Sequence, residues 1–230
     1  MRHMVLFLVS LVLTAPAWAQ GDDANMRHPE IMAVEGDGTE SRYIIGDAAW
    51  GNVLVTLAAL RGVDPEQAPA IAQQLWERRN TNQPIFLFEY ARLVVDTDPD
   101  RALHAYFLAR ARSIYDASRC VDPTALGVVA AASEQAGPVV HELMSSDAAR
   151  LEAALASVIA SDEIFTSQAS PWWACSYGNA AYLAAVNSAD MPGEEWLKVE
   201  GVWPSLRAAI SNNMNANLAR LREGLQAAQQ

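Results

Sequence analysis

Hydrophobic residues recur every three or four positions over most of the chain after residue 46, and this period predicts amphipathic helices. The clearest apolar stripe follows one face of segment 204–227. It consists of Leu206, Ile210, Met214, Leu218, Leu221 and Leu225. A second stripe covers 147–160, and no segment alternates long enough between hydrophobic and polar positions to predict a strand. The pattern therefore predicts an all-α fold, either an array of helical hairpins or an irregular α-bundle.

Three Asp-Pro pairs mark expected helix starts at Asp64, Asp98 and Asp122. An aspartate can accept hydrogen bonds from the free N–H groups of a first helical turn, and a proline at the next position loses only an N–H that has no partner there. Together with the stripes, these starts predict helices over residues 47–61, 65–79, 84–96, 99–117, 123–133, 138–145, 147–160, 177–187 and 204–227.

The first nineteen residues have the pattern of a cleavable secretory signal. Arg2 precedes a short apolar run, and Ala17-Trp18-Ala19 offers small residues at the positions that a signal peptidase recognises. We therefore expect cleavage after Ala19 and a periplasmic or secreted protein. Residues 20–42 are polar and acidic and are expected to form a flexible leader, which leaves 43–230 as a single all-α domain.

The chain has two cysteines, Cys120 and Cys175. Because an exported protein meets an oxidising compartment, we expect them to form a disulfide. Closing a loop of about 56 residues stabilises a fold by roughly 4 kcal/mol in the chain-entropy description. The alternative is a reactive thiol with His104 or His141 as its base, but neither cysteine lies in a thiol-protease signature.

The first two Asp-Pro pairs begin 34 residues apart, which is the period of tetratricopeptide repeats. The stretch 88–117 resembles the related Sel1-like repeats, and the resemblance covers about residues 50–117. In that family pattern Ala91 would belong to the first helix of a pair, and Ala102, Tyr106 and Ala109 to the second. The resemblance implies a curved helical surface that binds proteins. General packing of helical hairpins selects the same small residues, so that alternative stays open.

The full chain carries 27 acidic and 16 basic residues, a net charge of −11. A field of this sign disfavours nucleic acid and anionic lipid and could attract a basic protein partner. Once the signal is removed, no apolar stretch approaches the length of a membrane span. We therefore expect a protein partner, no nucleic acid and no membrane insertion.

Catalytic motifs are scarce along the chain. The three histidines after the signal, His28, His104 and His141, do not have the spacing of a helical zinc site, and no nucleophile elbow or phosphate-binding loop occurs. We predict no metal and no cofactor. Glu89 is the one weak catalytic candidate, because its apolar surroundings would raise a carboxyl pKa if it were buried without a partner. The competing interpretation is an ion pair with Arg92 or with an arginine of the next helix.

The densest aromatic segment is 170–178, which contains Trp172, Trp173 and Tyr177 beside Cys175. Such residues could bind a sugar or anchor a protein interface. They could instead cover the disulfide and close a helix junction, with core packing for at least one tryptophan.

These observations favour an exported helical protein that binds a protein partner in the periplasm without catalysis, as an adaptor or as an immunity-type protein that blocks a toxin. The alternative is an envelope or cell-wall hydrolase that uses Glu89, with Trp172 and Trp173 holding sugar.

Overall fold

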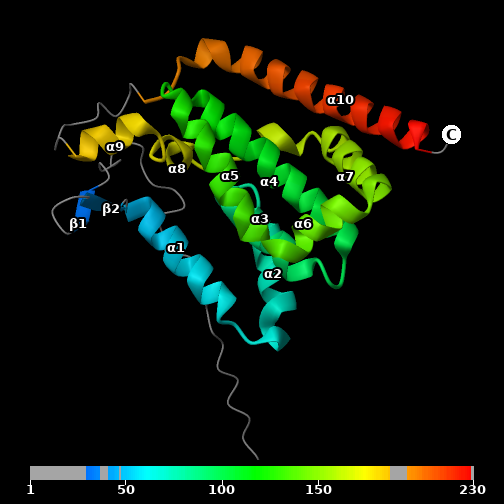
Figure 1. Ribbon diagram of the computed structural model, residues 1–230, viewed down its shortest axis with the longest axis horizontal. Helices are drawn as coiled ribbons and strands as arrows, with labels where there is room; N and C mark the ends of the chain where they lie inside the picture. Colours follow the sequence, from blue (N-terminus) through cyan, green and yellow to red (C-terminus); the bar gives the residue numbers. More distant parts are fainter. Residues whose placement is uncertain (1–29, 37–40, 47, 187–195, 229–230) are drawn as a thin grey trace, which may run out of the picture.

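The structure is a computed structural model that describes residues 30–36, 41–46, 48–186 and 196–228. Helices dominate these residues, so the predicted all-α class is confirmed (Figure 1). The α-helices are α1 (Ala48–Arg61), α2 (Ala68–Glu77), α3 (Ile85–Val94), α4 (Pro99–Arg119), α5 (Gly127–Ser133), α6 (Gly137–Ser146), α7 (Ala148–Ala160), α8 (Trp172–Cys175), α9 (Asn179–Val186) and α10 (Trp203–Ala227). Short 3-10 helices are η3 (Pro65–Gln67), η4 (Pro123–Leu126), η5 (Glu134–Ala136), η6 (Glu163–Phe165) and η7 (Glu200–Val202). The predicted signal, His28 and part of the predicted leader lie outside the described residues.

All three Asp-Pro pairs begin helices as predicted. The carboxylate of Asp98 accepts the N–H of Arg101 at 3.0 Å in the first turn of α4. Asp64 and Asp122 accept first-turn N–H groups of η3 and η4 at 3.0 and 2.9 Å. At Asp64 and Asp122 the helical segment begins with a short 3-10 helix, η3 before α2 and η4 before α5, rather than with a continuous α-helix.

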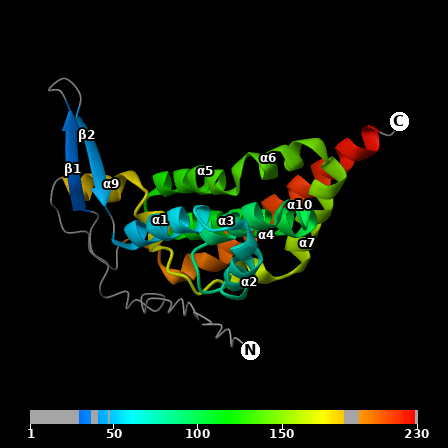
Figure 2. The same ribbon diagram turned by 90° about the horizontal axis from the view of Figure 1, so that it is seen from below.

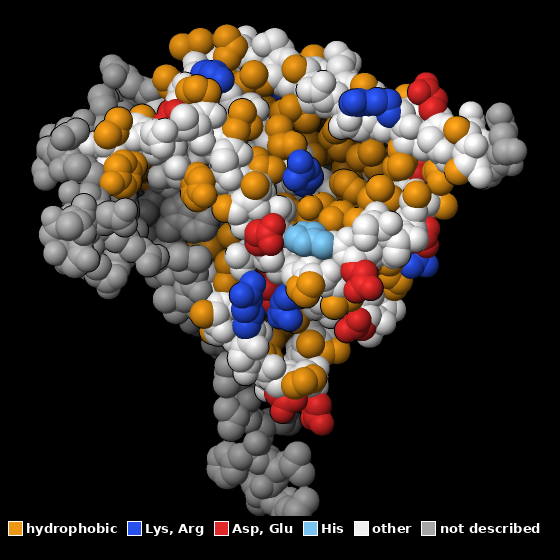
Figure 3. All heavy atoms as spheres, viewed as in Figure 1, with side chains coloured by type: hydrophobic (Ala, Val, Ile, Leu, Met, Phe, Trp, Pro, Cys, Tyr) orange, Lys and Arg blue, Asp and Glu red, His pale blue; other side chains and the backbone are white. Residues whose placement is uncertain are grey.

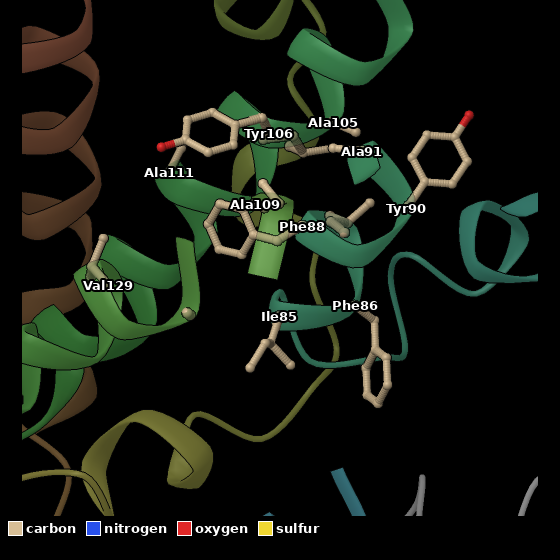
Figure 4. Close-up of a cluster of buried hydrophobic side chains, with 14 of the residues drawn as sticks. Ile85, Phe86, Phe88, Tyr90, Ala91, Ala105, Tyr106, Ala109, Ala111 and Val129 are labelled. Atoms are coloured by element: carbon tan, nitrogen blue, oxygen red, sulfur yellow. The ribbon is translucent and has the colours of Figure 1, made fainter. Parts of the chain in front are cut away.

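Helix α4 is the centre of the fold and packs against α3, α5, α7 and α10. Its closest neighbour is α3, because alanines at the contact let the two backbones approach. Figure 4 shows Phe88 and Tyr106 in this contact, with ring centroids 5.3 Å apart in an edge-to-face arrangement. Ala91 and Ala109 lie beside them with no exposed surface, which suits both the repeat resemblance and general hairpin packing.

Helix α10 crosses one side of the molecule and packs on α4 and α7 (Figure 1). The predicted stripe faces the body, because Ile210 and Leu218 are buried and Met214 packs against the core. On the face in Figure 3, hydrophobic side chains gather in the hollow beneath this helix. The apolar side of α10 is thus the side that holds it to α4 and α7.

A β-hairpin departs from the sequence prediction of a helical protein with an irregular leader. Strand β1 (Glu30–Gly36) pairs antiparallel with β2 (Ser41–Gly46), with a register shift between Ile31 and Ala33. The hairpin projects from one end of the helical body (Figure 2). Each strand contains a short unbroken run of apolar residues. The hydrophobic and polar positions therefore do not alternate, and the pattern that predicts a strand is absent. Glycines between two short apolar runs were the available hairpin signal.

A buried arginine joins two loops that are far apart in the sequence. The guanidinium of Arg112 donates to the carbonyl oxygens of Arg79 and Glu163, the latter at 2.7 Å, and to Asn80 Oδ1 at 2.6 Å. Burial lowers the pKa of Arg112 to about 10, so the group remains charged at neutral pH. A second contact, from the Gln168 N–H to the Asn80 carbonyl at 2.7 Å, ties the same loops. The end of α2 is therefore anchored to the segment that follows α7.

Candidate functional site

An open groove of about 990 Å³ lies between α2 and the turn that joins α3 to α4, with the end of α1 at its margin. Its hydrophobic lining consists of Leu60, Val63, Pro65, Ala68, Pro69, Ala72, Trp76, Tyr90, Leu93 and Val94. Its polar and charged lining consists of Arg61, Gln73, Glu77, Arg92, Asp96, Thr97, Asp98 and Arg101. A lining in which hydrophobic residues are mixed with charges of both signs suits a polypeptide segment, which itself has apolar side chains and polar main-chain groups.

One wall of the groove is built around Trp76. Its half-buried ring lies 5.1 Å from the ring of Tyr90, and the guanidinium carbons of Arg79 and Arg101 lie 4.6 and 4.9 Å from its centroid. His104 approaches the same indole edge-on at 6.0 Å. Cation–π contacts of this kind hold the side chains in place. The wall is therefore an ordered layer of aromatic rings and guanidinium groups.

Tyr90 and Arg101 are coupled across this wall. Burial raises the pKa of the Tyr90 phenol above its ordinary value, and the positive charge of Arg101 opposes that rise. Figure 4 shows that Tyr90 points away from the Phe88–Tyr106 contact. Its ring is therefore part of α3 packing on one side and of the groove wall on the other.

Glu89 lies behind the groove, fully buried. Arg92 binds it with two parallel contacts, Nη2 to Oε1 at 2.6 Å and Nε to Oε2 at 3.0 Å. The ion pair with Arg92 is thus the interpretation that the structure supports. A carboxylate that is closed off from solvent, with both oxygens held by an arginine, lacks the access to a substrate that a general acid needs. The hydrolase alternative loses its candidate residue.

The predicted disulfide is present between Cys120 and Cys175, whose Cα atoms are 5.4 Å apart. It ties the end of α4 to α8, and both residues are buried. Neither cysteine is free, so the thiol alternative is excluded. His104 instead contacts Ser157 Oγ at 2.9 Å, and burial lowers its pKa.

Trp172 and Trp173 lie in the core rather than on a binding surface. The exposed fractions of the two residues are 7% and 2%. Trp172 packs edge-on against Trp196 at 5.0 Å, and Trp173 donates its indole N–H to Asp116 Oδ2 at 2.8 Å. The two neighbouring rings of α8 thus each have a separate buried contact, Trp172 with Trp196 and Trp173 with Asp116 of α4. As placed, neither ring can stack on a sugar or a partner.

Asp116 of α4 is a fully buried carboxyl group beside α8. Its carboxylate accepts from Arg119 on one oxygen and from Trp173 on the other. Burial raises the pKa of Asp116, and the two donors oppose that rise. Arg119 in turn lies between the rings of Tyr115 and Trp203, at 4.5 and 5.1 Å from their centroids. These contacts serve packing between α4, α8 and the start of α10.

Tyr177 is the one residue of the predicted aromatic binding set that reaches the surface, with 49% of its area exposed. It lies over Gly127, in a region where Leu126 and Leu183 are also exposed. The Asp122 carboxylate positions this region, because it accepts the N–H of Ala180 at 2.7 Å at the start of α9. A binding role for Tyr177 stays a prediction.

Sequence reasoning missed the groove and its wall residues, Trp76, Tyr90 and Arg101. They come from three helices, and no motif connects them along the chain. The only available signal was an isolated tryptophan followed closely by two arginines at the end of a predicted helix.

Within the described residues, no cluster of three or more His, Cys, Asp or Glu side chains could hold a metal ion. None of the described helices combines the length and the apolar character needed to cross a bilayer. No model of a known protein family, no curated protein and no solved structure matches this chain.

Proposed function

We propose that this protein is exported by a signal at residues 1–19 and binds a protein partner in the periplasm through the groove beside α2, without catalysis. The observation that carries the proposal is the groove wall, in which a half-buried Trp76 lies against Tyr90 and Arg101. Tryptophan and arginine are among the residues that dominate the binding energy of protein interfaces, and Trp76 and Arg101 retain surface for a partner. Tyr90 is buried and supports the Trp76 ring from behind.

The shape and polarity of the groove support a polypeptide over a small rigid ligand. Its volume is at the upper end of the range for small-molecule pockets, and it is open to solvent along α2. Donors and acceptors both line it, as Arg61 and Asp96 illustrate. A peptide main chain needs both kinds of group where it is removed from water.

The test is to fill the groove without touching the core. Gln73 is exposed and lines the groove, whereas the next residue, Gln74, is exposed and does not line it. Partners captured from an envelope extract of the natural host by the disulfide-bonded protein are compared with those of Gln73→Trp and Gln74→Trp. We expect Gln73→Trp to lose a specific partner that Gln74→Trp retains. A partner retained equally by both variants would contradict binding in the groove.

Export has its own test. The mass of the protein purified from the natural host should correspond to a chain that begins at Gln20 and carries the Cys120–Cys175 disulfide. An unprocessed amino terminus with both sulfurs reduced would refute the periplasmic or secreted location.

Two versions of the function differ in what the partner does. An immunity-type protein protects a sensitive strain against a toxin, whereas an adaptor does not. Expression of the wild type and of Gln73→Trp in a sensitive strain separates them, since groove-dependent protection would identify the immunity version.

A further inference from the structure

The two guanidinium groups that lie against Trp76 differ in their acidic partners. Arg79 has one, because its Nε lies 2.8 Å from Glu163 Oε2. Arg101 lies over Trp76 and Tyr90, and no carboxylate of the described residues forms an ion pair with it. In the part of the chain that the structure describes, the cation that the groove wall orients thus has no carboxylate at ion-pair distance.

The other arginines of the groove are engaged elsewhere. Arg92 is neutralised by the buried Glu89, and Arg61 donates to Gln135 at 2.7 Å. Among the groove acids, Asp98 is occupied as the helix cap of α4. Among the arginines of the groove, the exposed Arg101 is therefore the one most available to a segment lying there.

A bound segment would remove water from this guanidinium. Hydrophobic residues, Trp76 among them, line the groove beside Arg101, so a segment that covers them buries apolar surface and excludes solvent from the neighbouring guanidinium. Taking a cation out of water without an anion is costly, while a carboxylate on the partner compensates it with charge-assisted hydrogen bonds. The planar guanidinium of Arg101 suits a two-pronged carboxylate contact.

We propose that the groove binds a polypeptide segment that places an aspartate or glutamate side chain on Arg101, beside apolar side chains that pack against Trp76 and the hydrophobic lining near it. This inference rests on the proposed function and names the chemistry of its partner. The proposal concerns one acidic residue of the bound segment and does not fix the net charge of the whole partner. It is compatible with a partner that is basic as a whole and is drawn by the net charge of −11.

The test uses random peptides displayed on phage and selected on the mature, disulfide-bonded protein, with binders to Gln73→Trp subtracted. We expect the remaining peptides to be enriched in Asp or Glu next to apolar residues. Arg101→Glu should weaken the binding of a synthetic peptide with an enriched sequence by about thirtyfold or more. The same peptide with its acid changed to lysine should bind Arg101→Glu better than it binds wild type.

Arg110 provides the matched control, because it is an exposed arginine of the same helix that does not line the groove. Arg110→Glu should change the affinity little, and thermal melts should show that both variants are folded. Groove-dependent peptides without acidic enrichment, or equal losses in Arg101→Glu and Arg110→Glu, would overturn the inference while leaving the proposed function standing. Failure to recover any peptide that discriminates between wild type and Gln73→Trp would count against the groove as a binding site.

Discussion

The contact between Asp122 and Gly178 gives the sharpest quantitative test of the structure. A Cβ placed on Gly178 would lie 2.5 Å from Asp122 Oδ2, well inside van der Waals contact. The carboxylate cannot move freely, because it accepts the Ala180 N–H at 2.7 Å and the Thr124 N–H at 2.9 Å. Although partial burial raises the pKa of Asp122, these hydrogen bonds lower it overall, so the group is ionised at neutral pH.

The magnitudes follow from these contacts. Gly178→Ala should cost about 2 kcal/mol, through overpacking or through loss of the Ala180 contact. Asp122→Ala should also cost about 2 kcal/mol, because it removes N-terminal hydrogen bonds from η4 and α9. In the double variant the alanine meets no carboxylate, so the total should stay near 2 to 2.5 kcal/mol instead of about 4. Each single change should lower Tm by roughly 4–8 °C.

Denaturant unfolding of the four proteins at neutral pH, with the disulfide intact, measures this cycle. Gly201→Ala is the control, because a Cβ there meets nothing within 4 Å. Additivity within about 0.5 kcal/mol would refute the reasoning, since it would mean that Gly178 and the Asp122 carboxylate do not share the contact.

Three further predictions concern the parts of the fold that support the groove and the helix junction. Replacing both Cys120 and Cys175 by serine should lower the free energy of unfolding by about 4 kcal/mol, measured against the oxidised wild type in denaturant, and an unchanged midpoint would contradict it. Arg112→Met should cost about 3–5 kcal/mol in the same assay, because it removes a buried guanidinium from the main-chain carbonyls of two partly buried loops. The hydrogen bond from Arg79 lowers the pKa of Glu163, so the pair stabilises the fold above the ordinary glutamate pKa of about 4.3 and this contribution is lost as the pH falls through the lower folded pKa. Glu163→Gln should therefore flatten the acid side of the stability profile, and an identical profile would argue against the pair.

The helical layout was predictable because it depends on local chemistry. The stripe along α10 and the carboxylates of Asp64, Asp98 and Asp122 act within a few residues of where they stand, so reading along the chain finds them. The disulfide was predictable from its residue count and the expected compartment. The hairpin was missed because strand pairing is a contact between two segments, and the period of each alone is uninformative.

The candidate site was harder to predict because its side chains come from segments that are far apart in the sequence. Glu89 could be paired with Arg92 from spacing alone, since three residues along a helix share a face. Trp172 and Trp173 carry no sequence mark that distinguishes a surface pair from a core pair, because the outcome depends on Asp116 and Trp196. Arg101 could not be identified as a site residue from the sequence, because its contact with Trp76 depends on how α2 packs beside α4.

The anchoring of α2 by Arg112 has a consequence for how a partner is met. Because this guanidinium and the Arg79–Glu163 pair hold the end of the helix from behind, Trp76 occupies its position before any encounter. A receptor wall that is already rigid loses little conformational entropy on association, so more of the contact energy is retained as affinity. Under the proposed function, a partner should therefore bind to a preformed groove wall, and the conformational change on binding should occur mainly in the partner segment.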